Sequence, residues 1–187
     1  SKKDIQQVFT MKDAIEADKI AFKTIVQEKA DIPLRTVISA PKYDANFLFM
    51  PAYAPELDVA SFKNVNIFPK NAQQNLPTAP AQVLLIDGKT GITKAILDGT
   101  YVTQLRTGAA SGTAFEVLGK KECKIGALIG TGGQAACQLE AMLVARNLEE
   151  VRVYSRNQER TEQFVKEMQE ELKSYGTNIV TAASSDE

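Results

Sequence analysis

The stretch ALIGTGGQAACQ, residues 127–138, has the residue types and spacing of a phosphate-binding loop. Gly130 and Gly132 directly follow an apolar run, and Ala135 stands at the third small position of a G-x-G-x-x-G/A pattern. The first glycine permits a tight turn, the second lets backbone amides approach a pyrophosphate, and the third small residue allows close helix–strand packing. The phosphate charge would then lie at a helix N-terminus. The alternative is a glycine-rich turn in an α/β fold that binds nothing.

The end of the next apolar run bears on which dinucleotide would bind. An acidic residue there holds the ribose 2′-hydroxyl of NAD, whereas an arginine accepts the 2′-phosphate of NADP. The chain has Ser155, Arg156 and Asn157 at this point, about 25 residues after Gly130, with no carboxylate among them. These side chains offer hydrogen-bond donors to a phosphate, so the sequence favours NADP(H), with NAD(H) as the alternative. Arg156 could equally be a solvated residue at the start of a helix.

Three basic residues that precede the loop are candidate anion ligands. Lys63 lies in VASFKNVNIF, on the same predicted strand face as Val65. It is either an edge residue that extends to solvent or a buried cation that needs an anion. Arg35, in LRTVIS, is either an exposed residue or a ligand. Arg106 lies among small side chains in TQLRTGAASGTA, where an arginine would bind a carboxylate or phosphate bidentately. The pattern alone decides none of these alternatives.

Composition excludes several classes of site. The 187 residues contain no histidine, so within them there is no Ser-His or Cys-His pair and no histidine-ligated metal site. Cys123 and Cys137 form no CxxC pair, and we expect neither a disulfide framework nor a bound metal. The net charge of −1 gives no basic patch for nucleic acid or a membrane surface. The low cysteine content favours a cytoplasmic protein.

The elements before the loop predict an α+β unit over residues 1–119. An amphipathic helix begins at a capping box formed by Thr10 and Asp13. Four β-like runs follow, and DGKTG, residues 87–91, is the turn of a hairpin. A second helix is predicted over residues 98–119. The four β-like runs begin at Leu34, Asn46, Val59 and Ala81.

From residue 120 the pattern alternates strand and helix. Strand, helix, strand, helix and strand follow one another, as in one mononucleotide-binding half of a doubly wound fold. We therefore predict an α/β protein in which the N-terminal α+β domain, residues 1–119, is followed by the first half of a Rossmann-type domain, residues 120–187. The predicted segments are the strand 124–129, the helix 133–146, the strand 149–155, the helix 157–176 and the strand from 178.

Six stretches in a fixed order resemble the ornithine cyclodeaminase/mu-crystallin family. They are LRTVIS, FMPAY, FKNVNIFPKN, LPTAPAQVLLIDGKTGITKAILDG, QLRTGAAS and ALIGTGGQA, and the resemblance extends from the first predicted helix to the last residue. It implies an N-terminal domain that binds a small amino or imino acid and forms a homodimer through its sheet. It also implies an NAD(P)-dependent activity in amino-acid metabolism.

The resemblance assigns roles to individual residues. It implies that Arg35 and Lys63 grip the carboxylate region of the substrate, and that Lys63 also stabilises charge or relays a proton. Thr78 and Arg106 would reach the cofactor, and Arg106 would lie close to the substrate too. Gly132, Gly133 and Gln134 would form the phosphate loop, together with Gly130 of the glycine pattern.

The expected chemistry is hydride transfer between a nicotinamide and the α-carbon of an amino or imino acid. A cyclodeaminase, which is an ammonia-lyase, oxidises ornithine to an imine, closes the ring with loss of ammonia and returns the hydride to give proline. A ketimine or Δ1-pyrroline-2-carboxylate reductase instead reduces an imine with NADPH, and an alanine dehydrogenase-like activity is a further form. The non-enzymatic alternative is a mu-crystallin-like protein that binds cofactor and ligand.

The sequence also departs from the family pattern. Ser155 stands where NAD-dependent cyclodeaminases carry an acid, and YSRN resembles the mu-crystallin type, which uses NADPH. An acidic substrate contact expected after Arg35 has no clear counterpart, because Asn46 and Met50 occupy that region. The family's catalytic aspartate, from the second half of the nucleotide domain, is not among the 187 residues. We therefore expect these residues to be a portion of a longer chain.

Overall fold

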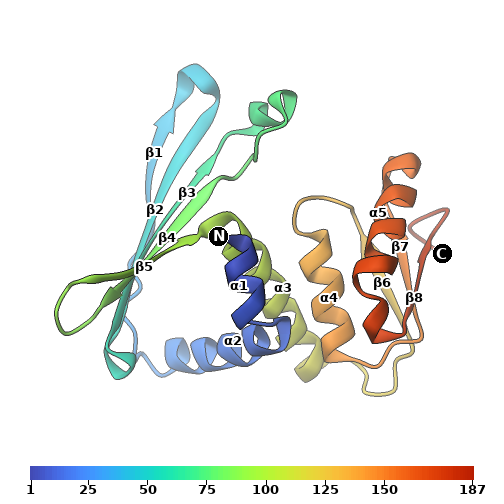
Figure 1. Cartoon of the computed structure of the whole chain (residues 1–187), viewed down its shortest axis with the longest axis horizontal. Coiled ribbons are helices and arrows are strands. Elements are labelled where there is room, and N and C mark those ends of the chain that lie inside the picture. Colours follow the sequence, from blue (N-terminus) through green and yellow to red (C-terminus); the bar gives the residue numbers. More distant parts are fainter. The chain divides into compact units, whose positions relative to one another are not determined.

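The computed structural model describes residues 1–187 and divides them into two compact units. The first unit comprises residues 1–8 and 20–103, and the second comprises residues 9–19 and 104–187. Each unit has its own sheet (Figure 1). The α/β fold is confirmed, whereas the assignment of substrate binding to residues 1–119 stays a prediction.

The sheet of the first unit has five antiparallel strands in the order β1-β2-β3-β4-β5 (Figure 1). Each strand pairs with the strand that follows it in the sequence, which makes the sheet a meander. All four predicted β-like runs form strands, and a fifth strand follows the predicted hairpin turn. The strands are β1 Thr36–Ala40, β2 Ala45–Ala54, β3 Val59–Ile67, β4 Ala81–Asp87 and β5 Thr93–Asp98.

The first two strand connections share one local design. Each is a 3₁₀ turn that begins with proline, η1 Pro41–Tyr43 and η2 Pro55–Leu57. Proline suits this position because its fixed φ matches the start of the turn. Each turn ends at an aspartate in the left-handed region, Asp44 or Asp58, whose amide donates to the proline carbonyl at 3.1 Å. Aspartate tolerates this conformation better than most residues. The third connection contains η3, Pro69–Gln74.

The connection between β4 and β5 is the predicted hairpin turn. The Asp87 carboxylate pairs with the Lys94 ammonium at 2.8 Å and accepts hydrogen bonds from the amides of Thr90 and Lys89 at 2.9 and 3.0 Å. These partners, with the Lys94 side chain first, hold the pKa of Asp87 well below its usual range. The carboxylate therefore fixes the turn in its ionised form.

Two of the helices before the glycine loop begin at side-chain caps, of which the capping box at Thr10 and Asp13 is predicted from the sequence. In the capping box the Asp13 carboxylate accepts from the Thr10 amide at 2.9 Å, and Thr10 Oγ1 accepts from the Asp13 amide at 3.2 Å. Asp98 accepts from the amide of Tyr101 at 3.0 Å and starts the next helix. The sequence did not predict the first helix of the chain. These helices are α1 Lys2–Val8, α2 Met11–Val26 and α3 Gly99–Leu118, and none in the structure is long and apolar enough to cross a membrane.

The second unit contains the predicted Rossmann-like half. Its three strands are parallel in the order β6-β7-β8, and a helix joins each strand to the next (Figure 1). The short 3₁₀ turn η4, Lys173–Tyr175, follows the second of these helices. The elements are β6 Ile125–Ile129, α4 Ala135–Ala145, β7 Glu150–Tyr154, α5 Gln158–Glu171 and β8 Asn178–Thr181.

The core of the second unit lies between this sheet and its two helices. Leu139 of α4 and both Val151 and Val153 of β7 are fully buried, and Met168 of α5 packs against the same cluster. Apolar side chains from every layer exclude water here, which stabilises the turns at the ends of the strands. This packed core therefore supports the turns described below.

Arg146, directly after α4, joins this core to the end of α3. Its Nη2 donates to the carbonyl oxygens of Phe115, Gly119 and Glu116 at 2.6, 2.9 and 3.2 Å. The last carbonyls of a helix have no partner within the helix, so one guanidinium caps the end of α3.

Candidate functional site

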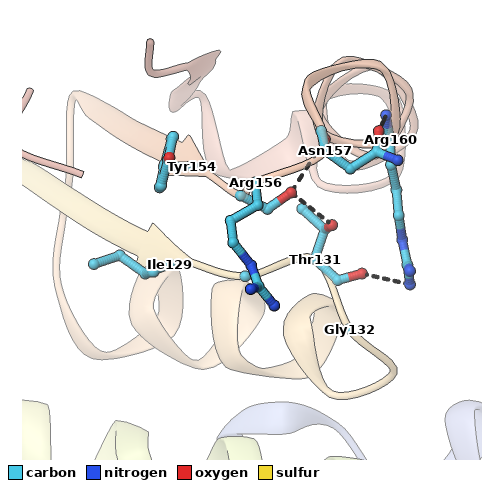
Figure 2. Close-up of a pocket in the computed structure, with 9 residues that line it drawn as sticks. Ile129, Thr131, Gly132, Tyr154, Arg156, Asn157 and Arg160 are labelled. Carbon is cyan, nitrogen blue, oxygen red and sulfur yellow. Dashed lines mark hydrogen bonds between the residues drawn. The ribbon is translucent and has the colours of Figure 1, made fainter. Parts of the chain in front are cut away.

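The turns after β6 and β7 line one cavity of about 350 Å³ in the second unit (Figure 2). The two strands are parallel neighbours, so their carboxyl ends meet at the same edge of the sheet, where ligands of such folds bind. The cavity is lined from the first turn by Gly130, Thr131 and Gly132, from the second turn by Ser155, Arg156 and Asn157, and from α5 by Arg160.

The glycine loop needs its glycines for geometric reasons. Gly130 has a φ of +101°, where a residue with a Cβ is strained. Its amide donates to the Tyr154 carbonyl at 2.7 Å, which joins the loop to the end of β7. A Cβ added at Gly130 or Gly132 would meet no atom within 4 Å, so both positions face open space. The loop thus leaves room beside its backbone for a ligand.

Helix α4 begins directly after the loop at Ala135, two residues after the predicted start at Gly133. Gln134 is its N-cap residue, and no side chain makes a capping hydrogen bond there. The first amides of a helix have no partner within the helix, so they are available to an anion. Ala135, at the third small position, is buried against the unit, as the close-packing requirement predicts.

The charge of the cavity is positive. Its lining includes two arginines and no carboxylate. Figure 2 shows the side chains of Arg156, in the second turn, and Arg160, in α5, extending toward the glycine loop, with Thr131 between them in this view. Nη2 of Arg160 donates to the Thr131 carbonyl at 3.0 Å. Two guanidinium groups beside open backbone amides favour an anionic ligand.

The turn after β7 is held by hydrogen bonds among its own side chains. Ser155 Oγ lies 2.7 Å from Thr161 Oγ1, 3.2 Å from the Asn157 carbonyl oxygen and 3.5 Å from Thr131 Oγ1 of the glycine loop. Thr161 is fully buried and lies 2.9 Å from the same Asn157 carbonyl. Asn157 Oδ1 caps α5 by accepting from the Arg160 amide at 2.9 Å.

Most of the predicted cofactor ligands converge at this cavity. Gly133 and Gln134 continue the same loop toward α4. Arg160 also lines the cavity and was not predicted from the sequence. Asn157 is a good N-cap residue, and the third residue after an N-cap lies in the first turn of the helix, which could have placed Arg160 beside this turn. The predicted ligands that line the cavity are Gly130, Gly132, Ser155, Arg156 and Asn157.

Arg106 is an exposed residue of α3 within the second unit. Burial raises the pKa of the Asp18 carboxyl on α2, and the positive charge of Arg106 opposes this shift. The Asp18 carboxyl therefore lies within electrostatic reach of the Arg106 guanidinium.

The remaining predicted ligands belong to the first unit. Lys63 is half-buried on β3, in register with Met50 of β2 and Val83 of β4. Because β3 is the central strand of the sheet, the edge-strand alternative for Lys63 is wrong. Arg35 is exposed and directly precedes β1, and Thr78 is exposed before β4, with its carbonyl accepting from the Phe68 amide at 2.9 Å.

Comparison with known proteins identifies relatives of the whole chain. The sequence model of the ornithine cyclodeaminase/mu-crystallin family matches residues 1–187. A Delta(1)-pyrroline-2-carboxylate reductase of Bacillus cereus is 32% identical over 172 residues, which cover 92% of this chain and 53% of that protein. The chain thus spans about half the length of the curated relatives it matches.

Two solved structures have the same fold. The Delta(1)-pyrroline-2-carboxylate reductase of Thermococcus litoralis, in complex with NADH and L-proline, is 38% identical with a TM-score of 0.90, covering 98% of this chain and 56% of that one. An archaeal alanine dehydrogenase dimer with bound NAD is 30% identical with a TM-score of 0.85, covering 98% of this chain and 55% of that one.

Proposed function

Since the chain belongs to the ornithine cyclodeaminase/mu-crystallin family, we propose that its second unit binds a nicotinamide dinucleotide for hydride transfer to or from an amino or imino acid. The observation that carries this proposal is the cavity at the ends of β6 and β7, which combines a glycine loop, an uncapped helix and two arginines. The relatives from Thermococcus litoralis and the archaeal alanine dehydrogenase hold NADH and NAD, respectively, which supports the proposal.

The residues of the cavity fit the phosphates of such a cofactor. The open space at Gly130 and Gly132 is where a Cβ would otherwise stand, and it gives a phosphate access to the backbone. We propose that the amides of Gly132, Gly133 and Gln134 hold the pyrophosphate at the start of α4. Thr78 and Arg106 are proposed as further cofactor contacts on the resemblance to the family.

The chain's own residues would bind and orient the substrate. A bound nicotinamide supplies or accepts the hydride, and the protein excludes water and fixes the geometry. We propose that Arg35 and Lys63 bind the substrate carboxylate region, and that Arg106 approaches the substrate as well. Lys63 Nζ holds a positive charge or a proton near the substrate nitrogen, as a general acid in imine reduction requires.

Imine reduction is the form of the reaction that the first unit favours. Met50 is the register partner of Lys63 on β2, so the neighbouring side chain is apolar. Asn46 accepts from Ser39 Oγ at 3.1 Å and is not a carboxylate. Neither residue offers a negative charge to the distal amine of ornithine. We therefore place reduction of an imino acid first, with ornithine cyclodeamination and oxidative deamination of alanine as the other candidates.

We propose NADP(H) as the preferred cofactor and NAD(H) as the alternative. Arg156 and Arg160 line the cavity where the second ribose of the dinucleotide would lie, and no carboxylate is present to hold a 2′-hydroxyl. A homodimer formed through the sheet of the N-terminal part is proposed on the resemblance, and light scattering of the purified protein tests it.

The proposed function is tested by following the nicotinamide absorbance of the full-length protein with its candidate substrates. NADPH with Δ1-pyrroline-2-carboxylate should be oxidised, and NAD⁺ with ornithine or alanine should react more slowly or not at all. Cofactor binding without turnover of any imino or amino acid would instead support a mu-crystallin-like binding protein. Absence of cofactor binding would contradict the proposal.

A further inference from the structure

The cavity contains a second arginine in a position that the glycine loop and the family resemblance do not account for. We infer that Arg160, together with Arg156, distinguishes a 2′-phosphate from a 2′-hydroxyl on the bound ribose, and that Ser155 holds the turn rather than contacting that phosphate. The inference rests on the proposed dinucleotide site and specifies which side chains select between its two cofactors.

The Ser155 hydroxyl has no hydrogen available to donate to a phosphate. A serine hydroxyl donates one hydrogen bond and accepts two. Its Oγ lies 2.7 Å from Thr161 Oγ1 and 3.2 Å from the Asn157 carbonyl, and a carbonyl can only accept. Thr131 Oγ1 donates to Ser155 Oγ across 3.5 Å. The Ser155 hydrogen is therefore committed inside the turn, and a phosphate, which accepts only, would have to displace one of these bonds.

Arg160 has the donors that Ser155 lacks. A guanidinium carries five N–H donors, and the bond from Nη2 to the Thr131 carbonyl at 3.0 Å uses one of them. Arg160 lies in the first turn of α5, where the Asn157 cap fixes its backbone. Its side chain extends toward Gly132, roughly parallel to that of Arg156 (Figure 2). The cavity thus receives two planar cations, one from Arg156 just before α5 and one from Arg160 in the first turn of that helix.

The chemistry of the pair suits a phosphate better than a hydroxyl. A phosphate monoester carries about −1.5 to −2 charges at pH 7, so it gains from both guanidinium groups. A ribose hydroxyl is neutral and is best held by a carboxylate acceptor, and the cavity lining contains none.

The bond to Thr131 gives Arg160 an additional positioning role. It ties the glycine loop to the first turn of α5, so the site for the 2′ group and the loop for the pyrophosphate are joined through one side chain. Removing Arg160 should therefore weaken binding of every nucleotide somewhat and binding of a 2′-phosphorylated nucleotide much more. A lysine at this position keeps the charge and should restore part of the difference.

Two nucleotides that differ only at the 2′ position test this directly. We would titrate the full-length protein with adenosine 2′,5′-bisphosphate and with adenosine 5′-monophosphate by calorimetry, at constant salt because the charge interaction is screened. The wild type should prefer the bisphosphate. Arg156→Ala and Arg160→Ala should each reduce that preference by about tenfold or more, the range for loss of a charged hydrogen bond, and Arg160→Lys should reduce it less.

Two control variants separate recognition from folding. Arg152→Ala removes an arginine of β7 that pairs with Glu150 at 2.8 Å and does not line the cavity, so the preference should stay at the wild-type value. Ser155→Ala should lower the affinity for both nucleotides by the same factor, which leaves their ratio unchanged.

The outcomes separate this inference from the proposed function. If the preference disappears in Ser155→Ala and survives in Arg160→Ala, the inference is wrong. If the wild type binds both nucleotides equally, the inference is wrong while the dinucleotide site stands. If it binds neither of them nor NADH, the proposed function fails. A misfolded Arg160→Ala protein is recognised by its melting curve. In that case the nucleotide preference of Arg160→Lys is the test: a preference lower than that of the wild type supports the inference, and an unchanged one contradicts it.

Discussion

The two units of the chain bring chemistry-bearing residues together in different ways. In the second unit, two turns that follow parallel neighbouring strands form the cavity, and each turn is a short run of consecutive residues. In the first unit, Arg35, Lys63 and Thr78 lie on separate segments of an antiparallel meander. Parallel strands place their carboxyl-end turns at one edge, so the second unit forms a recognisable site from local sequence.

The units also differ in how completely their apolar surfaces are enclosed. Leu139, Val151 and Val153 of the second unit are fully buried next to the turns that form the cavity. The first unit contains none of the largest fully buried side chains of the chain, while the carboxamide oxygens of Asn64 and Asn66 on its strand β3 are buried without a hydrogen-bond partner. The buried core of the second unit supports the cavity independently of the first sheet. We therefore expect substitutions in the first sheet to affect catalysis more than cofactor binding.

The largest expected effect comes from Lys63→Met in the first unit. Loss of a residue that donates a proton or stabilises charge typically costs a factor of about 10² to 10⁴, so kcat/KM for imine reduction should fall by at least a hundredfold. The dissociation constant of NADPH should stay within about twofold of the wild type, because the cavity belongs to the other unit.

Lys94→Met is the control for this prediction. Lys94 lies on β5 of the same sheet and pairs with Asp87 at 2.8 Å. Its replacement should leave kcat/KM close to the wild-type value. Equal losses of kcat/KM in the two variants, or weaker NADPH binding in Lys63→Met, would contradict the proposal that the first unit binds the substrate and the second binds the cofactor.

The same contrast explains how far the sequence could predict the structure. The capping box at Thr10 and Asp13, the hairpin turn at Asp87 and the tight turn at Gly130 each depend on a few consecutive residues. The structure confirms the geometry of all three, whereas phosphate binding at the glycine loop stays a prediction. Local hydrogen bonds and allowed φ values determine such features, so a short sequence pattern contains most of the information.

Features that depend on distant pairing could not be predicted in this way. The strand order places Lys63 on the central strand. The residues around Lys63 in the sequence do not determine which strands pair with β3, so this position could not be predicted. The bond from Arg160 to the Thr131 carbonyl joins residues 29 positions apart. The Pro-x-x-Asp connections were local and could have been found, since Asp44 and Asp58 stand in equivalent positions.

The next largest effect is expected at the glycine loop. Gly130→Ala places a Cβ at a φ of +101°, which costs about 1–3 kcal/mol or forces the loop to move. NADPH binding should weaken by about ten- to a hundredfold, because the methyl group also enters the cavity. Fluorescence titration of NADPH measures this.

Gly176→Ala provides the matched control for the loop. Gly176 also has a positive φ, +69°, and follows η4 away from the cavity lining. This variant should lose stability in a thermal melt yet bind NADPH like the wild type. If both variants bind equally well, the glycine loop does not hold the phosphates.

A smaller effect, on stability alone, is expected from Arg146→Ala. The variant leaves the carbonyls of Phe115, Gly119 and Glu116 without their shared donor, so the free energy of unfolding should fall by about 2 kcal/mol. Urea denaturation measures the loss, and Arg152→Ala should cost less because its partner Glu150 is close to the surface. If the free energy of unfolding falls by the same amount in both variants, Arg146 does not stabilise the fold by capping α3.

The second unit should also respond to pH through Glu140. Burial, with a contribution from the nearby Glu171 charge, raises the pKa of Glu140 in the folded chain, and a hydrogen bond from Tyr175 opposes the shift. A carboxyl with a raised folded pKa stabilises the fold at low pH, and that stability is lost as pH rises above its ordinary pKa of about 4.3. Glu140→Gln should therefore melt at a higher temperature than the wild type at pH 7 and show no such gain near pH 4.

The first unit should show the opposite and smallest response through Asp87. Its lowered pKa means that the ionised carboxylate stabilises the turn above its ordinary pKa and that this contribution disappears as pH falls through the folded pKa. Asp87→Asn should lower the melting temperature slightly at pH 7, and the difference from the wild type should shrink on acidification. A constant difference across the pH range would contradict this origin.

The most direct test of the central claim is a crystal structure of the full-length protein with NADPH. The account predicts that the pyrophosphate lies within hydrogen-bond distance of the amides of Gly132, Gly133 and Gln134, and that the 2′-phosphate lies against Arg156 and Arg160. Bound NADPH elsewhere on the molecule, with the loop after β6 free of phosphate, would contradict the account.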